Sequence, residues 1–154
     1  MIGIIVVLFS GAAISFFMVR ELEKRMTNTR ALCRLLRICT EQVEYFARSS
    51  GDIISGCELS LLRECGYYGT IPVQTFFEFL NSCEILCSKS RAIMLEFAAD
   101  FGKNYREEQI KRCKYYSERM ALRLSELETS LPTQRKLVVA LSLSATLMAV
   151  ILLV

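Results

Sequence analysis

The two ends of this chain carry no charged side chain, and this feature limits what the chain can fold into. All 19 Lys and Arg and all 16 Asp and Glu lie between Arg20 and Lys136. Eighteen helical residues reach about 27 Å, close to the roughly 30 Å thickness of a bilayer's hydrocarbon core. A 154-residue chain is too small to bury two helices that are apolar on every side. We therefore expect one transmembrane helix at each end, over residues 2–19 and 137–154.

Basic residues beside the two apolar segments predict their orientation. Arg20–Arg37 carries six Lys or Arg against two Glu, and Arg135 and Lys136 directly precede the last segment. Such residues accumulate on the cytosolic side of a membrane. We therefore expect residues 20–136 to form a cytosolic domain, with both termini outside the cytosol. The first segment is interpreted as retained, because no positively charged region precedes it as in a signal peptide.

Small residues recur four positions apart within each apolar segment, a spacing that lets membrane helices approach closely. Neither segment contains an ionisable side chain, which argues against a proton relay or ion path through one copy of the chain. The residues predicted to pack the two transmembrane helices are Gly11, Ser15, Ala140 and Ser144.

Apolar positions alternate at steps of three and four along two stretches of the charged middle. This heptad-like spacing predicts a long helix from residue 20 to about residue 49 and another from about residue 105 to residue 136. Their matching lengths favour an antiparallel hairpin. The residues predicted to pack between its two helices are Leu36, Val43, Phe46, Ile110, Cys113, Met120 and Leu127.

Between these helices, residues 52–101 contain shorter apolar stretches separated by turn residues. One helix is predicted over 53–65 and a second over 72–87, and Gly66 and Gly102 are each placed to end a helix. The aromatic residues expected in the core are Phe76, Phe77, Phe79, Phe97 and Phe101. The predicted fold class is all-α: an antiparallel long-helix hairpin with shorter capping helices forms a cytosolic bundle, and a transmembrane helix lies at each terminus.

Charge alternates in sign along the middle of the chain. Residues 38–102 hold nine acidic and four basic residues, whereas the segments on either side are basic. The basic segments would be attracted to anionic lipid headgroups, by about 1 kcal/mol per residue near the surface. The acidic segment allows two interpretations, an ordinary solvated face or an acidic surface that binds a soluble partner with basic residues.

Residues for catalysis or metal binding are scarce. The chain has no His, no C-x-x-C pair and no phosphate-binding glycine motif. Its seven Cys are an odd number in a domain expected to be cytosolic and reduced, so we interpret them as small core residues. We expect no enzyme activity, no cofactor, no metal, no small-molecule substrate and no nucleic-acid partner.

Two stretches resemble the stage III sporulation protein AB family of endospore-forming bacteria. The first runs from Gly3 to Tyr45, and the second, which contains FAADFGKNYREEQ, runs from Leu95 to the end of the chain. The residues that match the family's recurrent positions include Arg25, Leu32, Tyr45, Gly102 and Gln109. The family also ends in an apolar helix.

The resemblance implies a membrane component of the channel complex that links mother cell and forespore. Its cytosolic helical domain is expected to be similar to that of the platform protein of type II secretion systems and type IV pili. The expected partners are a secretion-type ATPase and the other channel subunits, with the domain on the mother-cell side of the bacterial cell membrane. The alternative function is a small channel or holin-like membrane permeabiliser.

Overall fold

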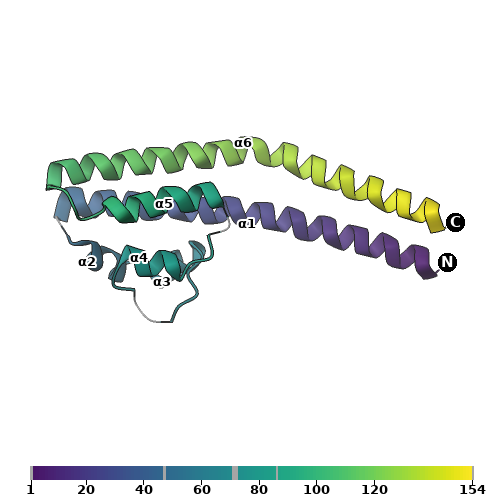
Figure 1. Cartoon of the computed structure of the whole chain (residues 1–154), viewed down its shortest axis with the longest axis horizontal. Helices are drawn as coiled ribbons and strands as arrows, with labels where there is room; N and C mark the ends of the chain where they lie inside the picture. The colour runs from purple at the N-terminus through teal and green to yellow at the C-terminus, as the bar shows by residue number, and fades with distance from the viewer. Residues whose placement is uncertain (1, 47, 71–72, 86, 154) are drawn as a thin grey trace. The chain divides into compact units, whose positions relative to one another are not determined.

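The computed structural model describes residues 2–46, 48–70, 73–85 and 87–153, and these residues are almost entirely helical (Figure 1). The described part contains no β-strand, only an isolated bridge between Tyr67 and Cys83. The predicted all-α class is therefore confirmed. The helices are α1 (Ile2–Phe46), α2 (Ser50–Ser55), α3 (Leu59–Glu64), α4 (Phe76–Asn81), α5 (Ser88–Asp100) and α6 (Arg106–Leu153).

The chain divides into two compact units. A terminal unit contains Met1–Lys24 and Leu127–Val154, and a central unit contains Arg25–Glu126. Each of the long helices α1 and α6 contributes one segment to each unit. The terminal unit is longer than the predicted transmembrane segments, which end at residue 19 and begin at residue 137. Its helix–helix contacts extend to polar residues such as Glu23 and Arg135.

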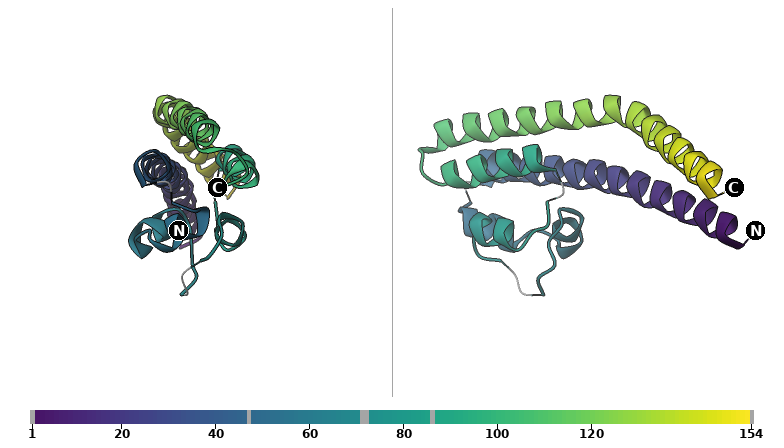
Figure 2. Two further views of the ribbon diagram at one scale, coloured as in Figure 1. Left: turned by 90° about the vertical axis from the view of Figure 1, so that its left-hand side faces the viewer. Right: turned by 45° about the vertical axis from the view of Figure 1, so that its right-hand side comes forward.

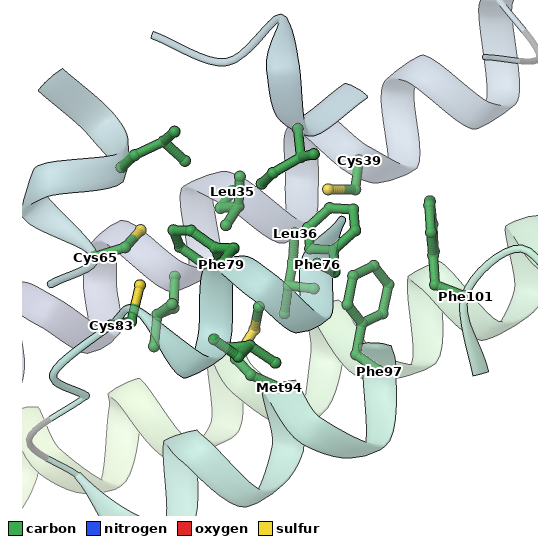
Figure 3. Close-up of a cluster of buried hydrophobic side chains, with 14 of the residues drawn as sticks. Leu35, Leu36, Cys39, Cys65, Phe76, Phe79, Cys83, Met94, Phe97 and Phe101 are labelled. Atoms are coloured by element: carbon green, nitrogen blue, oxygen red, sulfur yellow. The ribbon is translucent and has the colours of Figure 1, made fainter. Parts of the chain in front are cut away.

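The core of the central unit forms where α1, α4, α5 and α6 meet (Figure 3). Leu35 and Leu36 of α1 are fully buried, and so is Met94 of α5. The ring of Phe97 lies 5.3 Å from that of Phe76 and 4.8 Å from that of Phe101, between centroids. Burial of one such side chain stabilises the fold by about 1.5–3 kcal/mol, so this aromatic group is a major part of the core.

Four of the five aromatic residues expected in this core are buried: Phe76, Phe79, Phe97 and Phe101. Phe77 is the exception, with 55% of its surface exposed. Helix α4 is only six residues long and its inner face presents positions 76, 79 and 80 to the core. A residue at position 77 therefore points away from it.

The short helices α2, α3 and α4 lie together on one side of the central unit (Figure 2). The single helix predicted over 53–65 is instead two helices, because Gly56 caps the end of α2 and α3 begins after Glu58. The helix predicted from residue 72 is also shorter than expected. It begins after Thr75, whose hydroxyl accepts a hydrogen bond from the backbone N–H of Glu78.

Two glycines end helices as the sequence predicted. Gly66 follows α3 with a φ of 96°, and Gly102 follows α5 with a φ of 83°. These left-handed angles favour glycine over residues with a Cβ atom. After Gly102 the chain turns directly into α6, which continues through Pro132 as one helix of 48 residues.

Candidate functional site

The terminal unit exposes its large apolar side chains. The exposed residues include Phe9, Ile14, Phe16, Phe17 and Met18 of α1, and Leu141, Leu143, Leu147, Met148 and Ile151 of α6. Among the described residues, one helix meets the length and hydropathy expected of a membrane span, Arg106–Ile151, and its most apolar stretch has no buried residue. Apolar side chains on every side are typical of a helix surrounded by lipid.

Small and polar side chains lie between the two helices of this unit. The hydroxyl oxygens of Ser15 and Ser142 are 2.6 Å apart, and Thr146 Oγ1 donates to the carbonyl oxygen of Ser142 at 2.6 Å. A Cβ atom at Gly11 would overlap the side chain of Thr146. This unit therefore exposes apolar side chains and encloses polar ones, whereas a water-soluble helical bundle does the reverse.

Two of the four residues predicted to pack this unit lie where its two helices meet. Gly11 and Ser15 lie at the contact, whereas Ala140 and Ser144 are exposed. Ser142 and Thr146 take their place on α6. They have the same four-residue spacing, so the sequence contained the signal, but spacing alone does not determine which side of the helix faces its partner.

An ion pair joins the two helices at the polar end of this unit. The guanidinium of Arg135 donates to the carboxylate of Glu23, and both side chains are nearly half exposed. Exposed pairs of this kind contribute between zero and about 1 kcal/mol. Gly11 contacts Thr146, Ser15 contacts Ser142, and Glu23 pairs with Arg135. Residue numbers therefore rise along α1 as they fall along α6, which means that these two segments are antiparallel.

Most of the residues predicted to pack the long helices of the central unit are in its core. Leu36, Cys113 and Met120 are fully buried, Val43 is buried and Ile110 packs against the same cluster. Leu127 is half-buried and belongs to the terminal unit.

Phe46 does not pack as predicted. It lies at the last residue of α1 with 63% of its surface exposed, and the guanidinium of Arg48 lies 5.7 Å from its ring centroid. The prediction rested on the matching lengths of the two long helices, and the packed face of α1 ends before Phe46.

A buried glutamine links the turn between α5 and α6. Gln109 Oε1 accepts a hydrogen bond from the backbone N–H of Gly102 at 3.0 Å, and Gln109 Nε2 lies 3.6 Å from Cys113 Sγ. Gln109 is only 6% exposed, so these bonds are shielded from water. Both Gly102 and Gln109 carried the family resemblance, and the structure places them in contact.

The other residues of that resemblance occupy different environments. Leu32 is fully buried in the core, whereas Arg25 is exposed and Tyr45 is 71% exposed. Leu32 therefore has a packing role, and Tyr45 presents an aromatic ring on the surface of the central unit.

A second set of polar contacts joins the end of α5 to α6. Asp100 Oδ2 accepts hydrogen bonds from Tyr116 Oη at 2.7 Å and from Arg112 Nη1 at 2.6 Å. The bond from Tyr116, followed by that from Arg112, holds the pKa of Asp100 below its usual value. Burial, with the Asp100 carboxylate, raises the pKa of Tyr116 to about 12.

The structure pairs much of the acidic segment with the basic segments on either side. Glu64 pairs with Arg34 at 3.2 Å, Glu44 with Lys114 at 3.0 Å, and Glu96 with Arg119. These pairs neutralise part of the charge that the sequence presents as a block. Four exposed acids of the region around α2–α4 form no ion pair with another described residue: Asp52, Glu58, Glu78 and Glu84.

Comparison with known protein families matches residues 74–154 to stage III sporulation protein AB. This match covers more than half of the chain. The chain belongs to the stage III sporulation protein AB family. The matched region includes α4, α5 and α6 and therefore the contact between Gly102 and Gln109. No curated protein and no solved structure matches the chain.

As a member of the stage III sporulation protein AB family, the chain is a sporulation-related protein. Its cysteines fit the structural role expected from the sequence, because all seven are free and five are buried. Burial raises the pKa of the thiols of Cys39, Cys65 and Cys83, which makes their reactive thiolate forms scarce. No group of His, Cys, Asp and Glu within the described ranges is arranged to hold a metal ion.

Cys87 differs from the other buried cysteines. Burial acts to raise its pKa, but hydrogen bonds from Ser90 and Arg123 outweigh burial and lower it. The guanidinium Nη2 of Arg123 lies 3.6 Å from Cys87 Sγ. This contact joins Cys87, the residue directly before α5, to α6.

Proposed function

We propose that the chain is a non-enzymatic membrane scaffold of the sporulation channel that links mother cell and forespore. The observation that carries this proposal is the contrast between the two units. The terminal unit exposes apolar side chains and encloses polar ones, whereas the central unit encloses an aromatic and aliphatic core. One segment of α1 and one of α6 belong to each unit, so an anchor and a soluble head are parts of the same two helices.

The terminal segments of α1 and α6 are proposed as two membrane spans, with the central unit on the cytosolic, mother-cell side. The antiparallel contacts of Gly11 and Ser15 support two segments that cross side by side. Basic residues follow the first apolar segment and precede the second, in agreement with a cytosolic centre. In this proposal the two long helices form the legs of a hairpin.

The central unit is proposed to dock a secretion-type ATPase. Its core is packed with large side chains, which suits a rigid support. The acids around α2–α4 that form no ion pair with another described residue offer an excess of negative charge to a partner with basic residues, and the exposed ring of Phe77 lies in the same region.

Co-purification tests the scaffold function. The full chain, with an affinity tag, is isolated in mild detergent from sporulating cells, and an unrelated two-span membrane protein with the same tag serves as the control. We expect the ATPase and other channel subunits to accompany the chain and not the control. An intact, membrane-located chain that recovers none of them would contradict the proposal.

The two-span topology has its own test. Small epitope tags placed at each terminus are probed with antibody on intact protoplasts and after detergent treatment. We expect both tags to be detected before detergent, and a tag inserted after Gly69 to be detected only after it. Detection of only one terminus on intact protoplasts would replace the hairpin by a single span.

A further inference from the structure

A hollow of about 310 Å³ opens on the surface of α6 in the central unit. It is lined by Glu108, Lys111, Arg112, Tyr115 and Tyr116, and we call it the α6 hollow. The first four of these residues lie at positions i, i+3, i+4 and i+7 of one helix. Four residues with this spacing form the hole that receives a side chain of a neighbouring helix when two helices pack. The α6 hollow therefore has the form of an acceptor for one side chain of a partner helix.

Contacts within the central unit hold the walls of the α6 hollow in place. Arg112 Nη1 donates a hydrogen bond to Asp100 Oδ2 at 2.6 Å. The ring centroids of Tyr115 and Tyr116 are 5.2 Å apart, and the guanidinium of Arg119 lies 5.4 Å from the Tyr115 centroid. Side chains that are already held in one position lose little further conformational entropy on binding. The α6 hollow is therefore prepared to receive a partner.

One positive charge at the α6 hollow has no counterpart among the described residues. The guanidinium of Arg112 is paired with the carboxylates of Asp100 and Glu108. Lys111 is exposed and forms no ion pair with another described residue, although Glu107 lies one helical turn before it. The Lys111 ammonium group can therefore pair with a carboxylate from outside the chain.

The α6 hollow belongs to a longer exposed face of the helix. Lys111, Tyr115, Glu118 and Leu122 follow one another at steps of four, three and four residues, and we call them the α6 face. The exposed fraction is 54% for Tyr115 and 68% for Leu122, and Glu118 forms no ion pair with another described residue. In the central unit, no other described helix covers the side of α6 that faces away from α1 (Figure 1).

A second copy of the chain is a poor match for the α6 face. A parallel copy would place Lys111 opposite Lys111 and Glu118 opposite Glu118, and like charges in contact repel each other. An antiparallel copy aligned to pair Lys111 with Glu118 would place the apolar side chain of Leu122 against the carboxylate of Glu107. A helix from another protein is not subject to either restriction.

We propose that the α6 face binds an α-helix of another protein, with an Asp or Glu side chain of that helix in the α6 hollow. The carboxylate pairs with Lys111, and apolar side chains of the same helix pack on Tyr115 and Leu122. A basic side chain of the partner meets Glu118. This surface requires an acidic residue of its partner, whereas the acids around α2–α4 require a basic one. The inference does not depend on the proposed membrane anchoring or on ATPase docking.

Photocrosslinking of the full chain in sporulating cells tests the helical partner. The photoreactive amino acid p-benzoylphenylalanine replaces Tyr115 in one strain and Leu122 in another, and mass spectrometry locates the linked residues. These two positions are seven residues apart on α6. We expect both to link to the same protein, at positions about seven residues apart in one helix that also contains an Asp or Glu.

Charge variants test the contact with Lys111. Lys111→Glu is expected to lower the crosslink yield from position 115 about ten-fold or more, because two carboxylates would then meet in the α6 hollow. Replacing the partner's acidic residue by Lys should restore the yield. Lys89→Glu makes the same change in net charge at an exposed residue of the first turn of α5 and should retain the yield. Equal unfolding midpoints of the two variants confirm that both are folded.

Three results would overturn the proposal. The first is a folded, membrane-located chain that gives no crosslink from either position. The second is a crosslink between two copies of the chain, which would make the α6 face a self-association surface. The third is a yield that Lys111→Glu and Lys89→Glu change equally, because the charge of Lys111 would then have no specific role.

Discussion

The backbone N–H of Gly102 donates a hydrogen bond to the side-chain oxygen of Gln109, 3.0 Å away. The side-chain nitrogen of Gln109 lies 3.6 Å from Cys113 Sγ. One buried side chain thus holds the turn after α5 to the first turns of α6. These two helices supply much of the region that matches the stage III sporulation protein AB family.

Replacement of Gln109 should destabilise the central unit. Gln109→Ala removes the only partner shown for the Gly102 N–H among the described residues and leaves a cavity, for an expected loss of about 1–3 kcal/mol in the free energy of unfolding. Lys111→Ala, on the exposed side of the same helix, should change it by less than about 0.5 kcal/mol. Denaturant unfolding of the full chain in detergent measures both, and equal effects would contradict the role given to Gln109.

The two glycines with positive φ should differ in their sensitivity to substitution. Gly102→Ala introduces a Cβ atom at a left-handed angle and is expected to cost about 1–2 kcal/mol. Gly66→Ala has this cost as well, and its Cβ would overlap the carbonyl group of Glu84. We therefore expect a clearly larger loss at Gly66 in the same unfolding measurement. A larger loss at Gly102 would contradict the structure of the turn after α3.

Acid should weaken the link between Asp100 and α6. The pKa of Asp100 is lower in the folded chain than its value of about 3.9 in an unfolded one. Its stabilising effect is therefore complete above that value and is lost as the pH falls through the folded pKa. Asp100→Asn should be less stable than the original chain at neutral pH, and the difference should shrink on acidification. A constant difference between neutral and acid pH would contradict this prediction.

Tyr116→Phe provides a graded control for the same site. It removes the hydroxyl that contributes most to the lowered pKa of Asp100 and keeps the ring, which packs 5.7 Å from Phe97 between centroids. We expect stability and acid sensitivity between those of the original chain and Asp100→Asn, measured from unfolding midpoints across the same pH range.

Cysteine crosslinking should reveal the contact within the terminal unit. Ser15→Cys combined with Ser142→Cys places two thiols where the hydroxyl oxygens are 2.6 Å apart and should give an efficient disulfide on mild oxidation. Ser15→Cys with Ser144→Cys is the control, because Ser144 is exposed and its hydroxyl donates to Leu141 within its own helix. Mass spectrometry of the linked peptides gives the yields, and equal yields would refute this register.

Much of the central unit was predictable because its residues carry local signals. The apolar spacing of Leu36, Cys113 and Met120 identified core positions of both long helices, and glycine's tolerance of positive φ identified Gly66 and Gly102 as helix ends. The bounds of the short helices were harder to predict from the sequence. Gly56 divides one predicted helix into two, and the hydroxyl of Thr75 caps the first turn of α4.

Positions that depend on helix rotation were not predictable from spacing. Ala140 and Ser144 have the same small-residue pattern as Ser142 and Thr146, and only packing against Gly11 and Ser15 separates the two sets. Phe46 was predicted to pack from the matching lengths of the long helices but lies beyond the packed part of α1. A periodic pattern defines a face of a helix, and the neighbouring helix decides how much of that face is covered.

The sequence by itself determined the all-helical class, the two apolar ends, most of the core positions on the long helices and the family. These follow from residue type and spacing, which act along the chain. Only the tertiary structure decided which charges remain unpaired and which residues meet: Gly102 with Gln109, Ser15 with Ser142, and Thr29 with Ser90. Such contacts depend on the packing of helices distant in sequence, so a linear pattern does not contain them.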